Sequence, residues 1–308
     1  MSIDLKSLSP ANPAYLEQFL NDVSKPDDTP LDPAFVEVFT QGTPDSRLIV
    51  LLPGSYIKVR YMTDFVNGLR QKIPNARIIG INYPSRRDEY SVEQIDQFHL
   101  ADYVRWVMRH LATVAPGRRV TLVGHSLGTI TTQMTLLAYA NLPDAPYTID
   151  SLVILGGGPP KLSWSDYLET LPRLGTLWLI MSMVRDPKAF AWGKGMVRAL
   201  NGEERWRNLH NRHLIYPESR GIMKETFTSS AFNYLPRSLL DSLGIKVFVI
   251  GGDRDLFVTK GAILRGAAQW GGDHRILPLE HTDLVMDETG VEVGGMAGDW
   301  ITAALNEP

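Results

Sequence analysis

The 308-residue chain contains no cysteine. That absence excludes disulfide bonds, thiolate-bound metals and a cysteine nucleophile at the same time. Long apolar runs are also lacking, because the longest, Leu174 to Val184, is shorter than the roughly 20 residues that a bilayer requires. The first residues do not form a basic segment followed by an apolar one. We therefore expect a cytoplasmic protein without a transmembrane segment.

The chain has no large excess of either charge, with 31 Lys and Arg against 34 Asp and Glu and a net charge of −3. This balance argues against a nucleic-acid-binding protein. No histidine pair combines zinc-ligand spacing with a third ligand, so we expect no metal. Gly156 to Gly158 is followed by Pro159 and Pro160, which cannot open a phosphate-binding helix with free N–H groups. We expect no cofactor.

Apolar residues make up 44% of the chain, which is enough for a large core. Short apolar segments of strand type alternate with amphipathic segments of helix type. This alternation indicates an α/β fold with a mostly parallel sheet flanked by helices. Strands are predicted at 35–40, 47–52, 76–83, 120–123, 149–155, 246–250 and 275–279, and helices at 13–23, 62–72, 99–114, 127–140, 260–270 and 290–305.

Two segments depart from the alternation. Residues 1–34 are polar and rich in proline and aspartate, and we interpret them as an N-terminal arm. Residues 159–237 show no strand pattern, carry 12 basic against 7 acidic residues and hold four of the seven tryptophans. This segment is predicted to be a helical cap inserted before the last two core strands. The core is then formed by residues 35–158 and 238–308.

The most informative motif is Gly-His-Ser-Leu-Gly at 124–128, which follows a β-branched apolar run and precedes a helical segment. A G-x-S-x-G sequence between a strand and a helix is typical of a sharp turn that exposes the serine. Gly124 and Gly128 leave room where a Cβ would crowd such a turn. Ser126 is therefore the candidate nucleophile.

A serine hydroxyl needs an adjacent base, and that base needs an orienting group. Two later strand-type segments end in suitable residues. Lys246 to Ile250 leads into Gly-Gly-Asp-Arg-Asp, and Arg275 to Leu279 leads, after one residue, into His281. The acid is either Asp253 or Asp255, and Asp255 is preferred because Asp253 can cap the local turn.

On these elements the chain resembles the α/β-hydrolase superfamily between about residues 35 and 305. The G-H-S-L-G element, the G-x-x-D turn and the late histidine carry the resemblance, and the order Ser, Asp, His agrees with it. The resemblance implies Ser126 as nucleophile, His281 as general base and then acid, and an aspartate that orients the imidazole. It also implies that the 159–237 insertion acts as a lid. Because this superfamily catalyses many reactions, the resemblance does not identify a substrate.

The resemblance further implies an oxyanion hole made of backbone N–H groups. Leu127 supplies one, and the loop after the strand at 47–52 supplies the other. Relatives commonly have His-Gly in this loop, whereas this chain has Pro-Gly at positions 53 and 54. We assign the second donor to Ser55, with Tyr56 as the next candidate and a possible substrate contact through its side chain.

Several further residues have two interpretations. His125, inside the motif, is more consistent with a packing or supporting residue than with a catalytic one. The tryptophans of the cap line a substrate pocket or form the core of the cap itself. The positive charge of the cap is either a solvated face or a preference for an anionic group. The candidate substrate-binding residues are therefore Tyr56, Trp164, Trp178 and Trp192. They would bind a small apolar molecule, which is anionic under the second interpretation of the charge.

The leading hypothesis is a serine hydrolase that forms an acyl-enzyme with a carboxylic ester, lactone or thioester carrying a largely apolar acyl group. A carbon–carbon bond hydrolase or lyase, or an enzyme that releases or cyclises an acyl chain, fits the same residues. A ligand-binding protein with a vestigial triad is the alternative from another class. The sequence leaves substrate identity and oligomeric state open.

Overall fold

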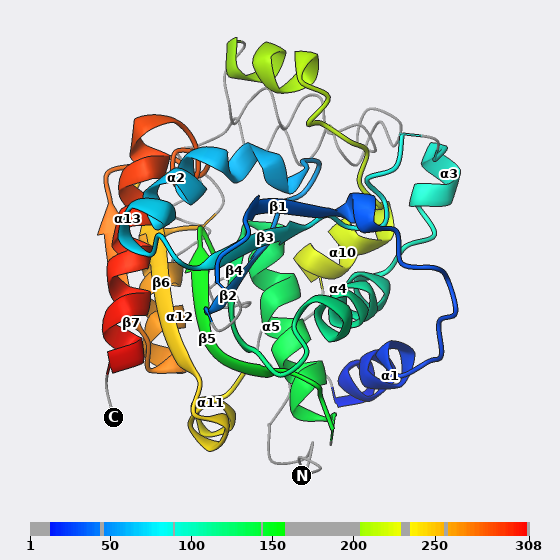
Figure 1. Ribbon diagram of the computed structural model, residues 1–308. Coiled ribbons are helices and arrows are strands. Elements are labelled where there is room, and N and C mark those ends of the chain that lie inside the picture. Colours follow the sequence, from blue (N-terminus) through cyan, green and yellow to red (C-terminus); the bar gives the residue numbers. More distant parts are fainter. Residues whose placement is uncertain are drawn as a thin grey trace.

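The computed structural model describes residues 13–43, 46–88, 90–142, 144–157, 204–228, 235–255 and 258–306. Its centre is a seven-stranded sheet in the order β1-β3-β2-β4-β5-β6-β7 (Figure 1). β1 runs antiparallel to β3, and all other neighbouring strands are parallel, which confirms the predicted mostly parallel sheet. The strands are β1 Val36–Thr40, β2 Leu48–Leu52, β3 Arg77–Ile81, β4 Arg119–His125, β5 Thr148–Leu155, β6 Lys246–Gly252 and β7 Asp273–Leu277.

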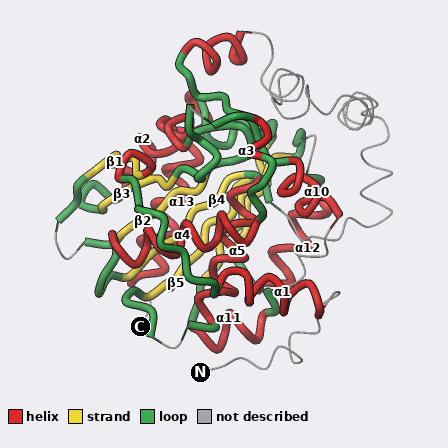
Figure 2. The backbone as a smooth tube through the Cα atoms, turned by 90° about the vertical axis from the view of Figure 1, so that its right-hand side faces the viewer, coloured by secondary structure: helices red, strands yellow, loops and turns green. Residues whose placement is uncertain are grey.

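The central strands are apolar because both faces of the sheet are covered. All five residues of β2 are buried, as are six of the seven in β4. Successive side chains point to opposite faces, so Leu48, Val50 and Leu52 join one core and Ile49 and Leu51 the other. Helices thus cover each face, and Figure 2 shows the strands running between them.

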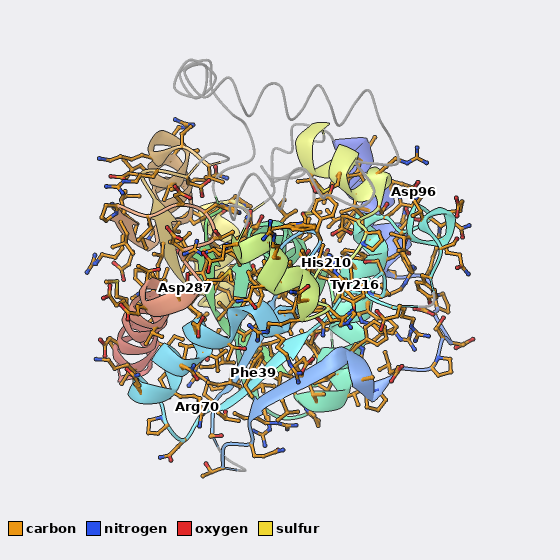
Figure 3. All side chains as sticks on the ribbon, turned by 90° about the horizontal axis from the view of Figure 1, so that it is seen from above. Phe39, Arg70, Asp96, His210, Tyr216 and Asp287 are labelled. Carbon is orange, nitrogen blue, oxygen red and sulfur yellow. The ribbon has the colours of Figure 1, made fainter. Side chains whose placement is uncertain are left out.

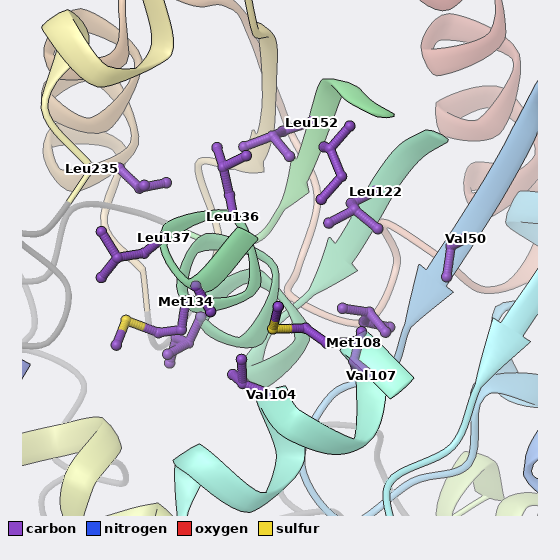
Figure 4. Close-up of a cluster of buried hydrophobic side chains, with 14 of the residues drawn as sticks. Val50, Val104, Val107, Met108, Leu122, Met134, Leu136, Leu137, Leu152 and Leu235 are labelled. Carbon is purple, nitrogen blue, oxygen red and sulfur yellow. The ribbon is translucent and has the colours of Figure 1, made fainter. Parts of the chain in front are cut away.

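On one face lie α2 (Thr63–Lys72) and α13 (Asp287–Asn306), which pack against each other. On the other lie α4 (Leu100–Val114), α5 (Leu127–Ala140) and α12 (Lys260–Trp270). Side chains from α4, α5 and the strands interlock there, as Figure 4 shows for Met134, Leu136 and Leu152 among others. Burying both sheet faces accounts for the apolar strand pattern that the sequence shows.

The helix predicted at 13–23 is present as α1 (Pro13–Val23) and packs against α4 through its buried residues Leu16 and Phe19. An ion pair of 2.7 Å between Asp27 and Arg109 holds the chain that follows. This part of the N-terminal arm is therefore part of the packed core. The remaining elements are η2 (Pro33–Phe35), η3 (Val59–Met62), α3 (Val92–Ile95), α10 (Arg220–Thr228) and α11 (Arg237–Leu243).

One strand differs from its expected position. β7 spans Asp273–Leu277, two residues earlier than the predicted 275–279. It lies at the edge of the sheet, so its first residues are exposed and polar and do not show the apolar pattern of a central strand. The N–H of Leu279 donates to the Leu277 carbonyl at 2.8 Å, and this turn ends the strand.

The segment predicted as a cap leaves the sheet after β5 and returns before β6. Within it the structure describes residues 204–228 and 235–237, and residues 204–211 are helical. Pro217 lies in a non-helical stretch, 214–219, which ends where α10 begins at Arg220. Ile215 forms an isolated β-bridge with Ile57, so this stretch lies against the loop after β2.

Candidate active site

Ser126 lies in the sharp turn that connects β4 to α5. Its φ of 55° and ψ of −119° are strained values for a residue with a Cβ. A Cβ on Gly124 would lie 2.3 Å from the Gly128 carbonyl oxygen, and one on Gly128 would lie 2.1 Å from that of Leu52. Both glycines are therefore required sterically, as the motif predicts.

The carboxyl ends of the neighbouring parallel strands converge on this turn. The Ser126 N–H donates to the Leu155 carbonyl at the end of β5, at 3.1 Å. A Cβ on the next residue, Gly156, would lie 3.1 Å from the His281 ring. Parallel register thus brings the serine turn, the end of β5 and the loop after β7 to one edge of the sheet, where ligands bind in open α/β sheets.

His281 contacts Asp255 and not Asp253. Its Nδ1 lies 2.6 Å from Asp255 Oδ2, and the two residues are only 4% and 1% exposed. The other oxygen of Asp255 accepts the Val258 N–H at 3.0 Å. Asp253 is exposed, and its backbone N–H donates to the Leu277 carbonyl. A carboxylate on Nδ1 holds the tautomer whose Nε2 can accept a proton.

His125 forms a hydrogen bond to the backbone of the loop that carries His281. Its Nε2 lies 3.0 Å from the His281 carbonyl oxygen, and since a carbonyl only accepts, Nε2 carries the proton. Its Nδ1 therefore accepts from the Tyr61 hydroxyl. Burial lowers the pKa of His125 well below its usual range, and nearby His281 acts in the same direction. A neutral, buried His125 fits the supporting role predicted for it.

The predicted oxyanion donors lie beside Ser126. Leu127 is the first residue of α5, where a backbone N–H has no helical acceptor. Ser55 lies in the loop after β2, next to Gly54, where an added Cβ would lie 3.1 Å from the Ser126 Cβ. The Tyr56 N–H instead donates to Glu218 at 3.4 Å, so Ser55 is the better placed of the two alternatives.

The Tyr56 side chain is fully buried and packs in the apolar cluster on the α2 and α13 face of the sheet. Burial, with the Glu218 carboxylate nearby, raises its pKa above the usual value. A substrate contact through this ring stays a prediction. Trp164, Trp178 and Trp192 lie outside the described residues.

Sequence reasoning did not identify Tyr61, Arg86 or Glu218 as neighbours of the site. The Arg86 and Glu218 side chains meet at 2.6 Å although 132 residues separate them. No local pattern marks either residue, because each lies outside the motif that carries the serine. Only their complete burial reveals them.

Among the described residues, no group of three or more His, Asp or Glu side chains is arranged to hold a metal ion. The same residues contain no helix long and apolar enough to cross a membrane.

Comparison with known proteins places this arrangement in context. A family model described as "Alpha/beta hydrolase family" matches residues 49–291. A comparison with curated proteins finds no match.

Solved structures share the fold at low identity. The structure reported with carboxylesterases of the thaumarchaeon Nitrososphaera gargenis is 16% identical, covers 89% of this chain and 96% of its own, and has a TM-score of 0.56. For a meta-cleavage product hydrolase from Pseudomonas fluorescens the values are 14%, 87%, 94% and 0.55. For a thioesterase domain from the curacin biosynthetic pathway they are 12%, 85%, 93% and 0.51. Likeness at these identities shows the fold alone.

Proposed function

The chain belongs to the alpha/beta hydrolase family, and from that premise we propose that it is a serine hydrolase using Ser126, His281 and Asp255. The observation that carries the proposal is the buried 2.6 Å contact between His281 and Asp255 at the edge where Ser126 occupies a strained turn. A buried histidine–aspartate pair beside a half-buried serine in a strained turn is typical of a catalytic site.

In the proposed reaction, Ser126 Oγ attacks the substrate carbonyl while His281 Nε2 takes the hydroxyl proton. The Leu127 and Ser55 N–H groups stabilise the oxyanion. The carbonyl re-forms as the bond to the leaving group breaks, and His281 returns the proton to that group. Water, deprotonated by His281, then attacks the acyl-enzyme. The bond between the acyl carbon and Ser126 Oγ breaks, His281 returns its proton to Oγ, and the acid leaves.

The proposed substrate is a carboxylic ester, lactone or thioester with a largely apolar acyl group. The apolar content of the 159–237 segment supports this class, and that segment is proposed as the lid over the site. Carboxylesterases and a thioesterase domain among the structures of the same fold are compatible with it.

Labelling of the purified protein with a fluorophosphonate tests the proposal, with Ser126→Ala and His281→Ala as controls. The expected result is labelling of the wild type that both variants abolish, because the phosphorus is attacked only by an activated serine. A folded wild type that does not react, or a Ser126→Ala variant that reacts equally, would refute the proposal and favour a binding protein with a vestigial triad.

A labelled enzyme is then assayed with simple esters, thioesters and β-diketones. The alternative hypothesis, a carbon–carbon bond hydrolase, is supported by the meta-cleavage product hydrolase among the structures that share the fold. Turnover of the diketone without turnover of the esters would favour that hypothesis. Esters or thioesters turned over faster would support the leading proposal, and a cyclic product would indicate release by an internal nucleophile.

A further inference from the structure

The loop after β2 is held by two charged side chains that come from distant parts of the chain. The Arg86 guanidinium donates to the Gly54 carbonyl at 3.5 Å and to the Ile57 carbonyl at 3.3 Å. Glu218 Oε2 accepts the Tyr56 N–H at 3.4 Å. These contacts lie on both sides of Ser55, the proposed second oxyanion donor.

The geometry of the peptide unit gives these contacts a direct consequence. The Gly54 carbonyl and the Ser55 N–H belong to the same planar trans peptide and point in opposite directions. A guanidinium on that carbonyl therefore turns the Ser55 N–H away from Arg86. The next peptide holds the Ser55 carbonyl and the Tyr56 N–H, so Glu218 fixes the plane on the other side of Ser55.

The positive charge of Arg86 also affects donor strength. A cation on a carbonyl polarises the peptide and makes its N–H a better hydrogen-bond donor. Burial opposes the charge on Arg86, but the Glu218 carboxylate together with Tyr103 and Tyr83 outweighs it and raises the Arg86 pKa, so the guanidinium stays charged.

The ion pair is completely enclosed, with both side chains 0% exposed. Tyr103 donates to the second Glu218 oxygen at 2.5 Å, and Arg86 donates to Ser85 Oγ at 2.8 Å and the Pro217 carbonyl at 3.1 Å. Replacing such a pair by well-packed apolar residues is often neutral or stabilising for a protein. Stability alone therefore does not account for these two charges in the core.

The backbone that the pair holds is strained. Tyr56 has a φ of 66°, in the left-handed region that disfavours residues with a Cβ. Its carbonyl accepts the Tyr216 N–H at 2.6 Å, and the Lys58 N–H donates to the Leu214 carbonyl at 3.0 Å. Figure 3 views the molecule from above and shows Tyr216 and His210 near the middle of that view. Residues 214–219 thus hold the loop in a conformation that the isolated loop would disfavour.

We propose that Arg86 and Glu218 are positioning residues that orient and polarise the Gly54–Ser55 peptide, whose N–H stabilises the oxyanion. The proposal rests on the proposed serine hydrolase function. It also means that residues 214–219, which belong to the 159–237 segment, contribute to the rate of the chemical step.

The test compares Arg86→Lys with Arg47→Lys. Arg47 forms a bidentate pair with Asp150, at 2.5 and 2.8 Å, next to the amino ends of the strands, and the two side chains are only 7% and 11% exposed. Lysine keeps the charge in each case but lacks the fork that reaches several acceptors. The readouts are the second-order rate of fluorophosphonate labelling, kcat and KM on an ester, and the melting temperature.

Arg86→Lys is expected to lower the labelling rate and kcat by roughly 10- to 100-fold with KM within about twofold, because the donor acts on charge that develops in the transition state. Both variants are expected to lower the melting temperature by similar amounts. Arg47→Lys should leave the labelling rate and kcat within about twofold of the wild type. If Arg86→Lys labels at the wild-type rate, the inference is overturned even though the hydrolase function stands.

A wild type whose labelling does not depend on Ser126 would instead refute the underlying function, and the inference with it. Should Arg86→Lys not fold, the double variant Arg86→Met with Glu218→Leu removes both charges together and avoids leaving one unpaired. It is expected to be folded and still slow to label. A folded double variant with wild-type kcat would overturn the inference as well.

Discussion

Two arginine–carboxylate pairs, one fully and one mostly buried, lie at opposite ends of the strands and hold different kinds of structure. Arg47, just before β2, binds Asp150 near the start of β5 and also donates to Thr121 on β4 between them. Arg86 and Glu218 lie beside the carboxyl ends and bind the backbone of a loop. The first pair links β2 to β5 across β4, whereas the second holds a strained loop next to the proposed nucleophile.

This difference follows from the direction of parallel strands. Their carboxyl ends meet at one edge, so the loops that leave them can bring functional groups together there. At the amino ends, Arg47 instead bonds Thr121 and Asp150. Substitutions at the two ends should therefore separate loss of activity from loss of stability.

The largest expected difference is between two aspartates at the carboxyl ends of the strands. Asp255→Asn should lower kcat by roughly 10³- to 10⁴-fold, because an amide no longer holds the productive tautomer of His281 or balances its positive charge. Asp253→Asn should leave kcat within about twofold, since that carboxylate is exposed and only its backbone N–H bonds Leu277. Ester hydrolysis under saturating substrate measures both. Equal losses in the two variants would contradict the assignment of Asp255.

A second contrast compares glycines at the two ends of β4. Gly128→Ala should cost about 3 kcal/mol or more and abolish activity, because its Cβ would lie 2.1 Å from the Leu52 carbonyl oxygen. Gly117→Ala, which meets no atom within 4 Å but has a φ of 70°, should cost only about 1–2 kcal/mol. Urea unfolding of both variants gives the two values. A Gly128→Ala protein with wild-type stability and activity would show that the turn is not required.

At the amino ends, Asp150→Asn should lower the free energy of unfolding by about 2 kcal/mol without changing kcat, because it leaves the Arg47 charge poorly compensated. Burial opposes ionisation of Asp150, but Arg47, with smaller contributions from Ser151 and Arg119, outweighs that effect and lowers the Asp150 pKa. Thermal unfolding and ester turnover are measured on the same preparation. A large loss of kcat at full stability would contradict the proposal that the amino ends serve stability and the carboxyl ends serve activity.

The smallest effect concerns pH. Burial lowers the pKa of His110 to about 4, and that of His125 well below its usual range, so the folded protein keeps both neutral in mild acid. The unfolded chain binds protons at both below about pH 6.5. Stability should therefore fall as the pH drops below that value, towards the folded-state pKa of His110.

Unfolding midpoints in urea at pH 7.5, 6 and 5 measure this decline. His110→Gln removes one of the two contributions and should show a shallower pH dependence than the wild type. A variant with the same slope would contradict the role of His110.

Local patterns predicted most of the core elements, including α1 and α12 with their observed ends, because apolar periodicity and turn residues act over a few positions. They also predicted the sharp turn at Ser126, since the steric demand on Gly124 and Gly128 arises within five consecutive residues. The position of β7 was two residues wrong because an exposed edge strand lacks the apolar signal.

The order of strands and helices along the chain and the serine turn follow from the sequence pattern, since they depend on neighbouring residues. Tertiary structure alone decided that Asp255 rather than Asp253 meets His281, that His125 bonds the His281 carbonyl, and that Arg86 meets Glu218. These contacts join residues far apart in sequence, and whether a polar group is buried or exposed depends on what the rest of the chain packs against it.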